Sequence, residues 1–240
     1  MKNNKITFRV FGIFLLIGLT LILPLSLKIS STKLFSSLSK LNFLGRDIAA
    51  SLSRIALSVG LAWLLSIIVG YFLHKSRRMY QLLNPSLNFL RNISPFAWLP
   101  FAIIWFGLGE SPIFFVMFIT IFFPAIISAL SIYESIPREL LDEAAVNGTH
   151  GFNLFWHIEM PLALPKLVYS FRILWGLGWG TIVAAEMLGV TSGLGFRLLD
   201  YRYLLKYENM VIYLLVMGVM GVLLDWFFGI IQKKIENRVN

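Results

Sequence analysis

Few residues of this chain have the type and spacing that covalent chemistry requires. The sequence contains no cysteine, which excludes disulfides, thiolate nucleophiles and cysteine-based metal sites. Its histidines show no metal-ligand spacing, because His150 lies in a predicted turn and so shares no helix face with His157, and we expect neither a metal nor a cofactor. No Ser/His/Asp arrangement stands out, and the phosphate-binding pattern G-x-x-x-x-G-K-[ST] is absent. We therefore expect a protein that is not itself an enzyme.

Charged residues within apolar segments are the stronger candidates. Arg172 and Glu186 share one helix face, but about 21 Å of helix separates them at about 1.5 Å per residue, so they cannot pair directly. Charges inside a membrane are costly and usually face a cavity or a partner. Either each residue lies near an interface and extends to water, or one faces a solute pathway. Arg172 could attract an anion there, as could Arg54 or Arg197.

A tryptophan and glycine cluster lies in the same segment. Trp175 and Trp179 alternate with Gly176, Gly178 and Gly180. Glycine lets membrane helices approach closely, so the cluster predicts packing, within one chain or between two copies. The alternative is an aromatic wall of a solute pathway.

A polar segment, residues 133–166, interrupts the apolar sequence. Pro137 can begin a helix, and the acidic residues that follow, including Asp142 and Glu143, suit the positive end of that helix. Gly148, preceded by asparagine, predicts a stop, and Thr149 can cap a second short helix. The second helix carries three aromatic residues at helical spacing, Phe152, Phe155 and Trp156. Pro161 and Pro165 are expected to end this helix.

This predicted pair of short helices around the turn 148–151 suits insertion into the groove of a partner protein. The alternative is an amphipathic hairpin on lipid headgroups. The segment has only two basic residues, Arg138 and Lys166, which argues against the lipid alternative.

The composition indicates an all-α membrane protein. The chain has 240 residues, of which 58% are apolar and 14% charged, whereas soluble domains are nearer half apolar and a quarter charged. A net charge of +9 fits the excess of basic residues in cytoplasmic loops, and we expect a lipid bilayer and no nucleic acid as partner. Apolar runs near the roughly 20 residues that span a bilayer predict six transmembrane helices: Val10–Leu27, Ile55–Leu73, Asn92–Gly109, Ser111–Tyr133, Leu167–Leu188 and Met210–Ile231.

Basic residues favour both termini in the cytoplasm. With that orientation the inner segments hold twelve Lys and Arg, and the outer segments seven. The segment 133–166 is then cytoplasmic. The first run also has features of a cleavable signal peptide, although no A-x-A site follows it. We divide the chain into residues 1–45, an N-terminal span with its outer loop, and residues 46–240, a transmembrane core.

The polar segment resembles the signature loop of the inner-membrane permeases of binding-protein-dependent ABC importers, E-A-A, three residues, G, nine residues, I-x-L-P. Gly148, Ile158 and Pro161 match at the right spacing, and Met160 replaces Leu. The literal E-A-A at 143–145 is one residue too close to Gly148, so the motif positions are Asp142, Glu143 and Ala144. Further motifs resemble the taurine, nitrate and aliphatic-sulfonate branch: Ser51–Arg54, Trp105–Glu110, Phe122–Pro124, Ala185–Met187 and Gly193–Gly195.

The resemblance implies a type I importer permease in the cell inner membrane that forms a pathway for a small solute, a sulfonate, taurine or nitrate-like anion. A second permease copy, separate ABC ATPase subunits and an extracytoplasmic solute-binding protein are the implied partners. Alternatives are a thiamine-precursor solute or an ATP-independent carrier. The implied ATPase-coupling residues are Pro137, Asp142, Glu143, Ala144, Gly148, Thr149, His150 and Gly151. Arg172, Trp175, Trp179 and Glu186 are the pathway candidates, and Phe152, Phe155 and Trp156 are expected to anchor the loop on the spans.

Overall fold

The computed structural model describes residues 43–239, and the predicted first span, Val10–Leu27, lies outside them. All elements of the described part are helical. Four helices are long and apolar enough to cross a membrane, and a bent pair gives a fifth if it is one span. The long helices are α3 (Leu44–Lys75), α6 (Glu110–Glu134), α9 (Met160–Gly189) and α11 (Tyr207–Val239).

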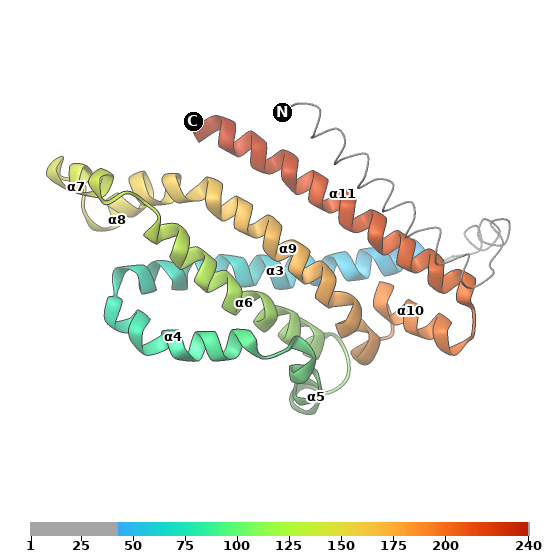
Figure 1. Ribbon diagram of the computed structural model, residues 1–240. Helices are drawn as coiled ribbons and strands as arrows, with labels where there is room; N and C mark the ends of the chain where they lie inside the picture. The colour runs from blue at the N-terminus through green and yellow to red at the C-terminus, as the bar shows by residue number, and fades with distance from the viewer. Residues whose placement is uncertain (1–42, 240) are drawn as a thin grey trace, which may run out of the picture.

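The main core lies where α3, α6 and α9 pack together (Figure 1). These helices are apolar on most faces because lipid or another helix surrounds each of them. Glycines set the closest approaches. A Cβ on Gly178 of α9 would lie 2.9 Å from Val59 of α3, and one on Gly70 of α3 would lie 2.7 Å from the Cβ of Ala129 of α6. Small residues therefore determine how closely the three helices pack.

The predicted third span, Asn92–Gly109, is wrong as a straight helix. The structure has two helices, α4 (Arg77–Asn92) and α5 (Pro95–Phe106), which meet at 93°. Pro95 explains the bend, because a proline disfavours helical backbone in the residue before it, and Ser94 is extended with ψ 136°. At 12 residues, α5 is about 18 Å long, too short to span a bilayer alone.

The predicted boundary before α9 is also wrong. The helix α8 (Gly151–Leu154) continues through a π-helical turn, η1 (Phe155–Glu159), directly into α9. Pro161 and Pro165 lie in the first turns of α9 and do not end it. The π turn lets Met160 N–H donate to Phe155 O, five residues back, where the regular pattern is disturbed by the coming proline.

The short helices gather at the two ends of the molecule. Figure 1 shows α7 (Arg138–Val146) and α8 at one end, and α10 (Leu194–Tyr203) at the other. The turn between α3 and α4 lies at the same end as α7. We call these the α7 end and the α10 end.

Candidate functional site

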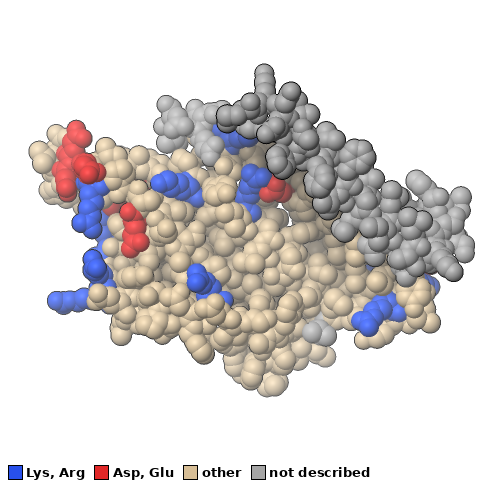
Figure 2. Space-filling view, in the orientation of Figure 1, with Lys and Arg blue, Asp and Glu red and all other residues tan. Residues whose placement is uncertain are grey.

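The helix α7 is an exposed projection. None of its residues is buried, and Val146 at its last position is 88% exposed. Its acidic residues form a red group at the α7 end in Figure 2, with basic side chains close below it. Hollows flank α7 on two sides. One of about 600 Å³ separates it from the α3–α4 turn, and one of about 380 Å³ lies between it and the start of α9.

The turn after α7 needs two glycines. Gly148 has φ +83° and Gly151 has φ +59°, in the region that side chains with a Cβ disfavour. Thr149 N–H donates to Ala144 O and Gly148 N–H to Ala145 O, which satisfies the last carbonyls of α7. The predicted break is confirmed. The predicted cap by Thr149 is wrong, because His150 occupies the N-cap position of α8 and makes no side-chain hydrogen bond there.

The structure places the predicted coupling residues together on this projection. Asp142, Glu143 and Ala144 lie on α7, and Ala144 is half-buried. Glu143 and Ala144 line the hollow between α7 and α9, and Asp142 lines the hollow beside the α3–α4 turn. The remaining residues follow the chain at either end of α7: Pro137, Gly148, Thr149, His150 and Gly151.

Of the three aromatic residues that were expected to anchor the loop on the spans, only Phe155 packs against one. Phe155 packs on Tyr71 of α3 with ring centres 4.4 Å apart. Phe152 and Trp156 instead contact each other edge to face and are 74% and 51% exposed. Phe152 and Trp156 are four residues apart and so share the exposed face of the helix, whereas Phe155 lies on the side that faces α3.

A buried ion pair joins the π turn η1, which follows α7 and α8, to α3. Lys75 Nζ lies 2.7 Å from Glu159 Oε1, and the Glu159 side chain is fully buried whereas that of Lys75 is 42% exposed. Lys75 is the last residue of α3, and Glu159 the last of the π turn. The α8–η1 segment is therefore joined to the end of α3 by this contact and to the start of α9 by the chain itself.

A second polar cluster fastens the α10 end. Glu186 is fully buried and accepts hydrogen bonds from Ser51 Oγ, Arg54 Nη1 and Gly195 N–H. Arg54 also binds both carboxylate oxygens of Glu110, each at 2.6 Å. Because every group has a partner, the cluster joins α3, α6, α9 and α10 without an unpaired buried charge.

The cluster continues through Asp47, which is 1% exposed. It accepts hydrogen bonds from Arg197 Nε, from Tyr213 OH and from Gly193 N–H. Burial alone would lower the pKa of Arg197, but the carboxylate of Asp47 raises it above its ordinary value, so this arginine stays charged. Arg54 and Arg197, two candidates for attracting an anion, are thus engaged by carboxylates of the chain itself.

The four predicted pathway residues do not form one site. Arg172 binds Asp225 of α11 through two hydrogen bonds of 2.7 and 2.6 Å, a partner that the sequence analysis missed. Trp175 is buried against Phe171 and Phe228, and Trp179 donates to Met217 O of α11. Glu186 belongs to the cluster at the α10 end. The described residues contain no group of three or more His, Cys, Asp or Glu placed to hold a metal ion.

Comparison with known proteins decides the family. Residues 62–239 match the family of binding-protein-dependent transport system inner membrane components. The chain belongs to this family. This permease is 32% identical over 192 residues to the taurine transport system permease protein TauC of Escherichia coli (strain K12), covering 80% of this chain and 70% of TauC. It is 33% identical over 192 residues to the nitrate import permease protein NrtB of Synechocystis sp. (strain ATCC 27184 / PCC 6803 / Kazusa), covering 80% and 70%.

Solved structures show the same fold for the permease. A chain of the MetNI methionine ABC transporter in an inward facing conformation superposes with a TM-score of 0.73 at 19% identity, covering 82% of this chain and 98% of that one. A chain of a bacterial alginate ABC transporter in complex with its alginate-bound periplasmic protein gives 0.71 at 16% identity, covering 97% and 92%. The permease is therefore a multi-pass membrane protein and the transport subunit of an ABC importer.

Proposed function

We propose that the permease forms half of the pathway of an ATP-driven importer for a small anion, and that its 133–166 segment docks on a separate ATPase subunit. A second copy of the chain completes the pathway, and a solute-binding protein delivers the solute at the α10 end. The α7 end is cytoplasmic, both termini lie in the cytoplasm, and the bilayer is the cell inner membrane.

The observation that carries this proposal is the exposed helix α7, which stands between two hollows and is followed by the α8–η1 segment, which a buried ion pair joins to α3. A helix without a buried face of its own gains stability from a partner groove. The exposed rings of Phe152 and Trp156 lie just beyond it and offer apolar area of the kind that interfaces bury.

Coupling follows from this geometry. Closure of two ATPase subunits around ATP would draw the two docked α7 helices together. Each helix would move the start of α9 through the continuous α8–η1 segment, and the end of α3 through Lys75 and Glu159. The energy comes from the difference in ATP affinity between the two states, because the permease contains no phosphate-binding loop.

The solute class is proposed from the relatives, whose names include taurine, nitrate and bicarbonate, all small and carrying an anionic group. Of the four pathway candidates, we assign Arg172, Trp175 and Trp179 to the α9–α11 contact. We assign Glu186 to the polar cluster that it forms with Arg54 and that keeps the α10 end closed. The solute must then meet another part of α9.

The experiment is uptake into proteoliposomes that contain the permease, its ATPase and its binding protein, with nitrate and taurine as labelled probes. We expect uptake only when ATP is present on the side of the membrane to which the ATPase subunit is bound. Uptake that proceeds equally without ATP, or without the ATPase subunit, would contradict the proposal and favour a secondary carrier.

A further inference from the structure

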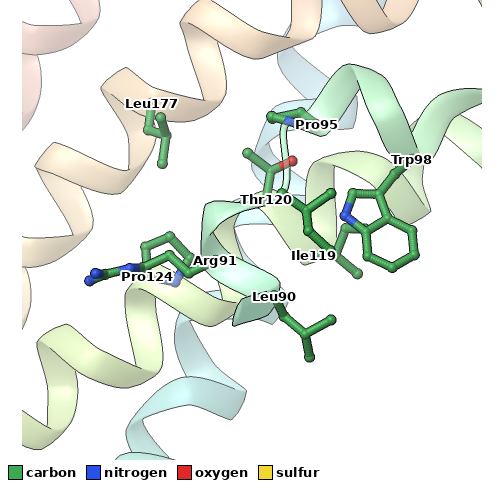
Figure 3. A pocket seen from close by; sticks show the side chains of 9 residues that line it. Leu90, Arg91, Pro95, Trp98, Ile119, Thr120, Pro124 and Leu177 are labelled. Carbon is green, nitrogen blue, oxygen red and sulfur yellow. The ribbon is translucent and has the colours of Figure 1, made fainter. Parts of the chain in front are cut away.

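A cavity lies at the bend between α4 and α5. It has a volume of about 190 Å³ and is lined from four helices, with Arg91 and Leu90 on α4, Pro95 and Trp98 on α5, Thr120 on α6 and Leu177 on α9 (Figure 3). Water occupies about 30 Å³ per molecule in the liquid, so the cavity holds roughly six groups of that size. It therefore suits a small solute and excludes a nucleotide or a peptide.

The cavity lies near the middle of the predicted bilayer. Thr120 is ten residues from the start of α6 at Glu110 and fourteen from its end at Glu134. These separations correspond to about 15 and 21 Å of helix. Arg91 shares the cavity with Thr120 and so lies at a similar depth, although its position in the sequence suggested a cytoplasmic loop.

Arg91 has no partner of opposite charge among residues 43–239. Within the described part of the chain it forms no ion pair or hydrogen bond, and the cavity is lined by no carboxylate. The Arg91 side chain is exposed on the single chain, but an arginine side chain reaches only about half the distance from this depth to the nearer end of α6, so it cannot extend to bulk water along the lipid. Charges at such depth face a water-filled cavity or a ligand. Arg54, Arg172 and Arg197 all bind carboxylates, which makes Arg91 different from them.

Two further groups of positive character lie beside the same space. The N-terminus of α5 meets the cavity at Pro95, which has no N–H, and Ala97 N–H donates to Ser94 O, so the helix start contributes the positive end of its dipole. Backbone N–H groups at a helix start carry a partial positive charge and favour anions. Trp98 adds an indole N–H, a donor that cannot accept. Broken membrane helices commonly present such an end to an anionic group of a solute.

The geometry points to a solute site at this cavity, in which Arg91 binds the anionic group of a small oxoanion, sulfonate or carboxylate. This inference rests on the proposed import function and places its substrate on the α4–α5 bend. Leu177 of α9 covers the cavity from the opposite side (Figure 3). A movement of α9 that follows α7 would thus open or close the site.

The test uses the absence of cysteine from the chain. Leu177→Cys places one thiol at the cavity, where the native side chain is 42% exposed. The full transporter in membrane vesicles is treated with two methanethiosulfonates of similar size, one carrying a sulfonate and one a trimethylammonium group. We expect the sulfonate reagent to react faster. In Arg91→Gln its rate is expected to fall, and that of the trimethylammonium reagent to rise, by about tenfold each, so the ratio of the two rates falls by about a hundredfold, the effect of a unit charge within about 10 Å near a protein surface.

Controls separate charge from folding and from distant charges. Arg91→Lys keeps the charge and is expected to keep the ratio. The pair Arg172→Gln with Asp225→Asn removes a different intramembrane arginine without changing net charge, and is also expected to keep it. Equal elution volumes and amounts of assembled transporter show that each variant folds.

A ratio that stays unchanged in Arg91→Gln, or a thiol that reacts with neither reagent from either side of the membrane, would overturn the inference. Uptake of nitrate and taurine is measured on the same preparations. Uptake that does not depend on ATP would refute the proposed function, while the reagent ratio would still report on the site.

Discussion

The ion pair between Lys75 and Glu159 predicts an asymmetric response to mutation. Glu159 is fully buried, whereas the Lys75 side chain is 42% exposed. Lys75→Met leaves a carboxylate buried without a counter-charge, which costs about 3 kcal/mol, the lower end of the range for broken buried pairs, because water reaches the lysine side of this one. Glu159→Met leaves a lysine that can turn to solvent, and we expect a cost below about 1 kcal/mol.

The assay is thermal unfolding of the purified transporter in detergent. At about 2–4 °C per kcal/mol for a chain of this size, Lys75→Met is expected to lower Tm by roughly 6–12 °C, and Glu159→Met by at most a few degrees. The double variant is expected to be close to wild type, because no charge is left buried.

Two results would refute this reasoning. One is a double variant whose loss equals the sum of the single losses, and the other is a larger loss for Glu159→Met than for Lys75→Met. The same double variant tests the coupling role. If the pair transmits movement from α7 to α3, this stable variant shows ATP hydrolysis with reduced uptake.

Further predictions concern the two ends of the molecule and the exposed aromatic pair. Gly148→Val forces a β-branched residue to φ +83°, and we expect ATP hydrolysis that no longer drives uptake, with Tm lowered by only a few degrees. Gly195→Ala places a Cβ against the carbonyl oxygen of Val183 and is expected to cost about 1–3 kcal/mol in unfolding measurements, whereas Gly180→Ala, with nothing within 4 Å, is expected to be neutral or stabilising. Equal Tm values for these two variants would contradict the described packing. Phe152→Ala and Trp156→Ala are expected to weaken binding of the ATPase subunit by fivefold or more without lowering Tm, and an unchanged affinity would remove these rings from the interface.

Local signals in the sequence were sufficient for the α7 end. The proline before α7 and the glycines at 148 and 151 act on their own backbone, so the turn could be placed from residue types alone. The long spans α3, α6, α9 and α11 follow in the same way from their apolar runs.

The charge pairs could not be predicted in this way. Lys75 and Glu159 are 84 residues apart, and Arg172 and Asp225 are 53 apart, so their pairing depends on helix packing that one sequence does not reveal. Pro95 carried a usable signal for the bend between α4 and α5. The continuous charge-free run after Arg91 instead predicts one straight span with Arg91 in the preceding loop, because hydropathy alone does not detect a break in a helix.

The most direct test of the central claim is the accessibility of one cysteine on α7. Val146→Cys is highly exposed and would be the only thiol of the permease. With a membrane-impermeant maleimide, the account predicts labelling in inside-out vesicles, none in right-side-out vesicles, and protection when the ATPase subunit is bound. Labelling from the outer side, or equal labelling with and without the ATPase, would contradict it.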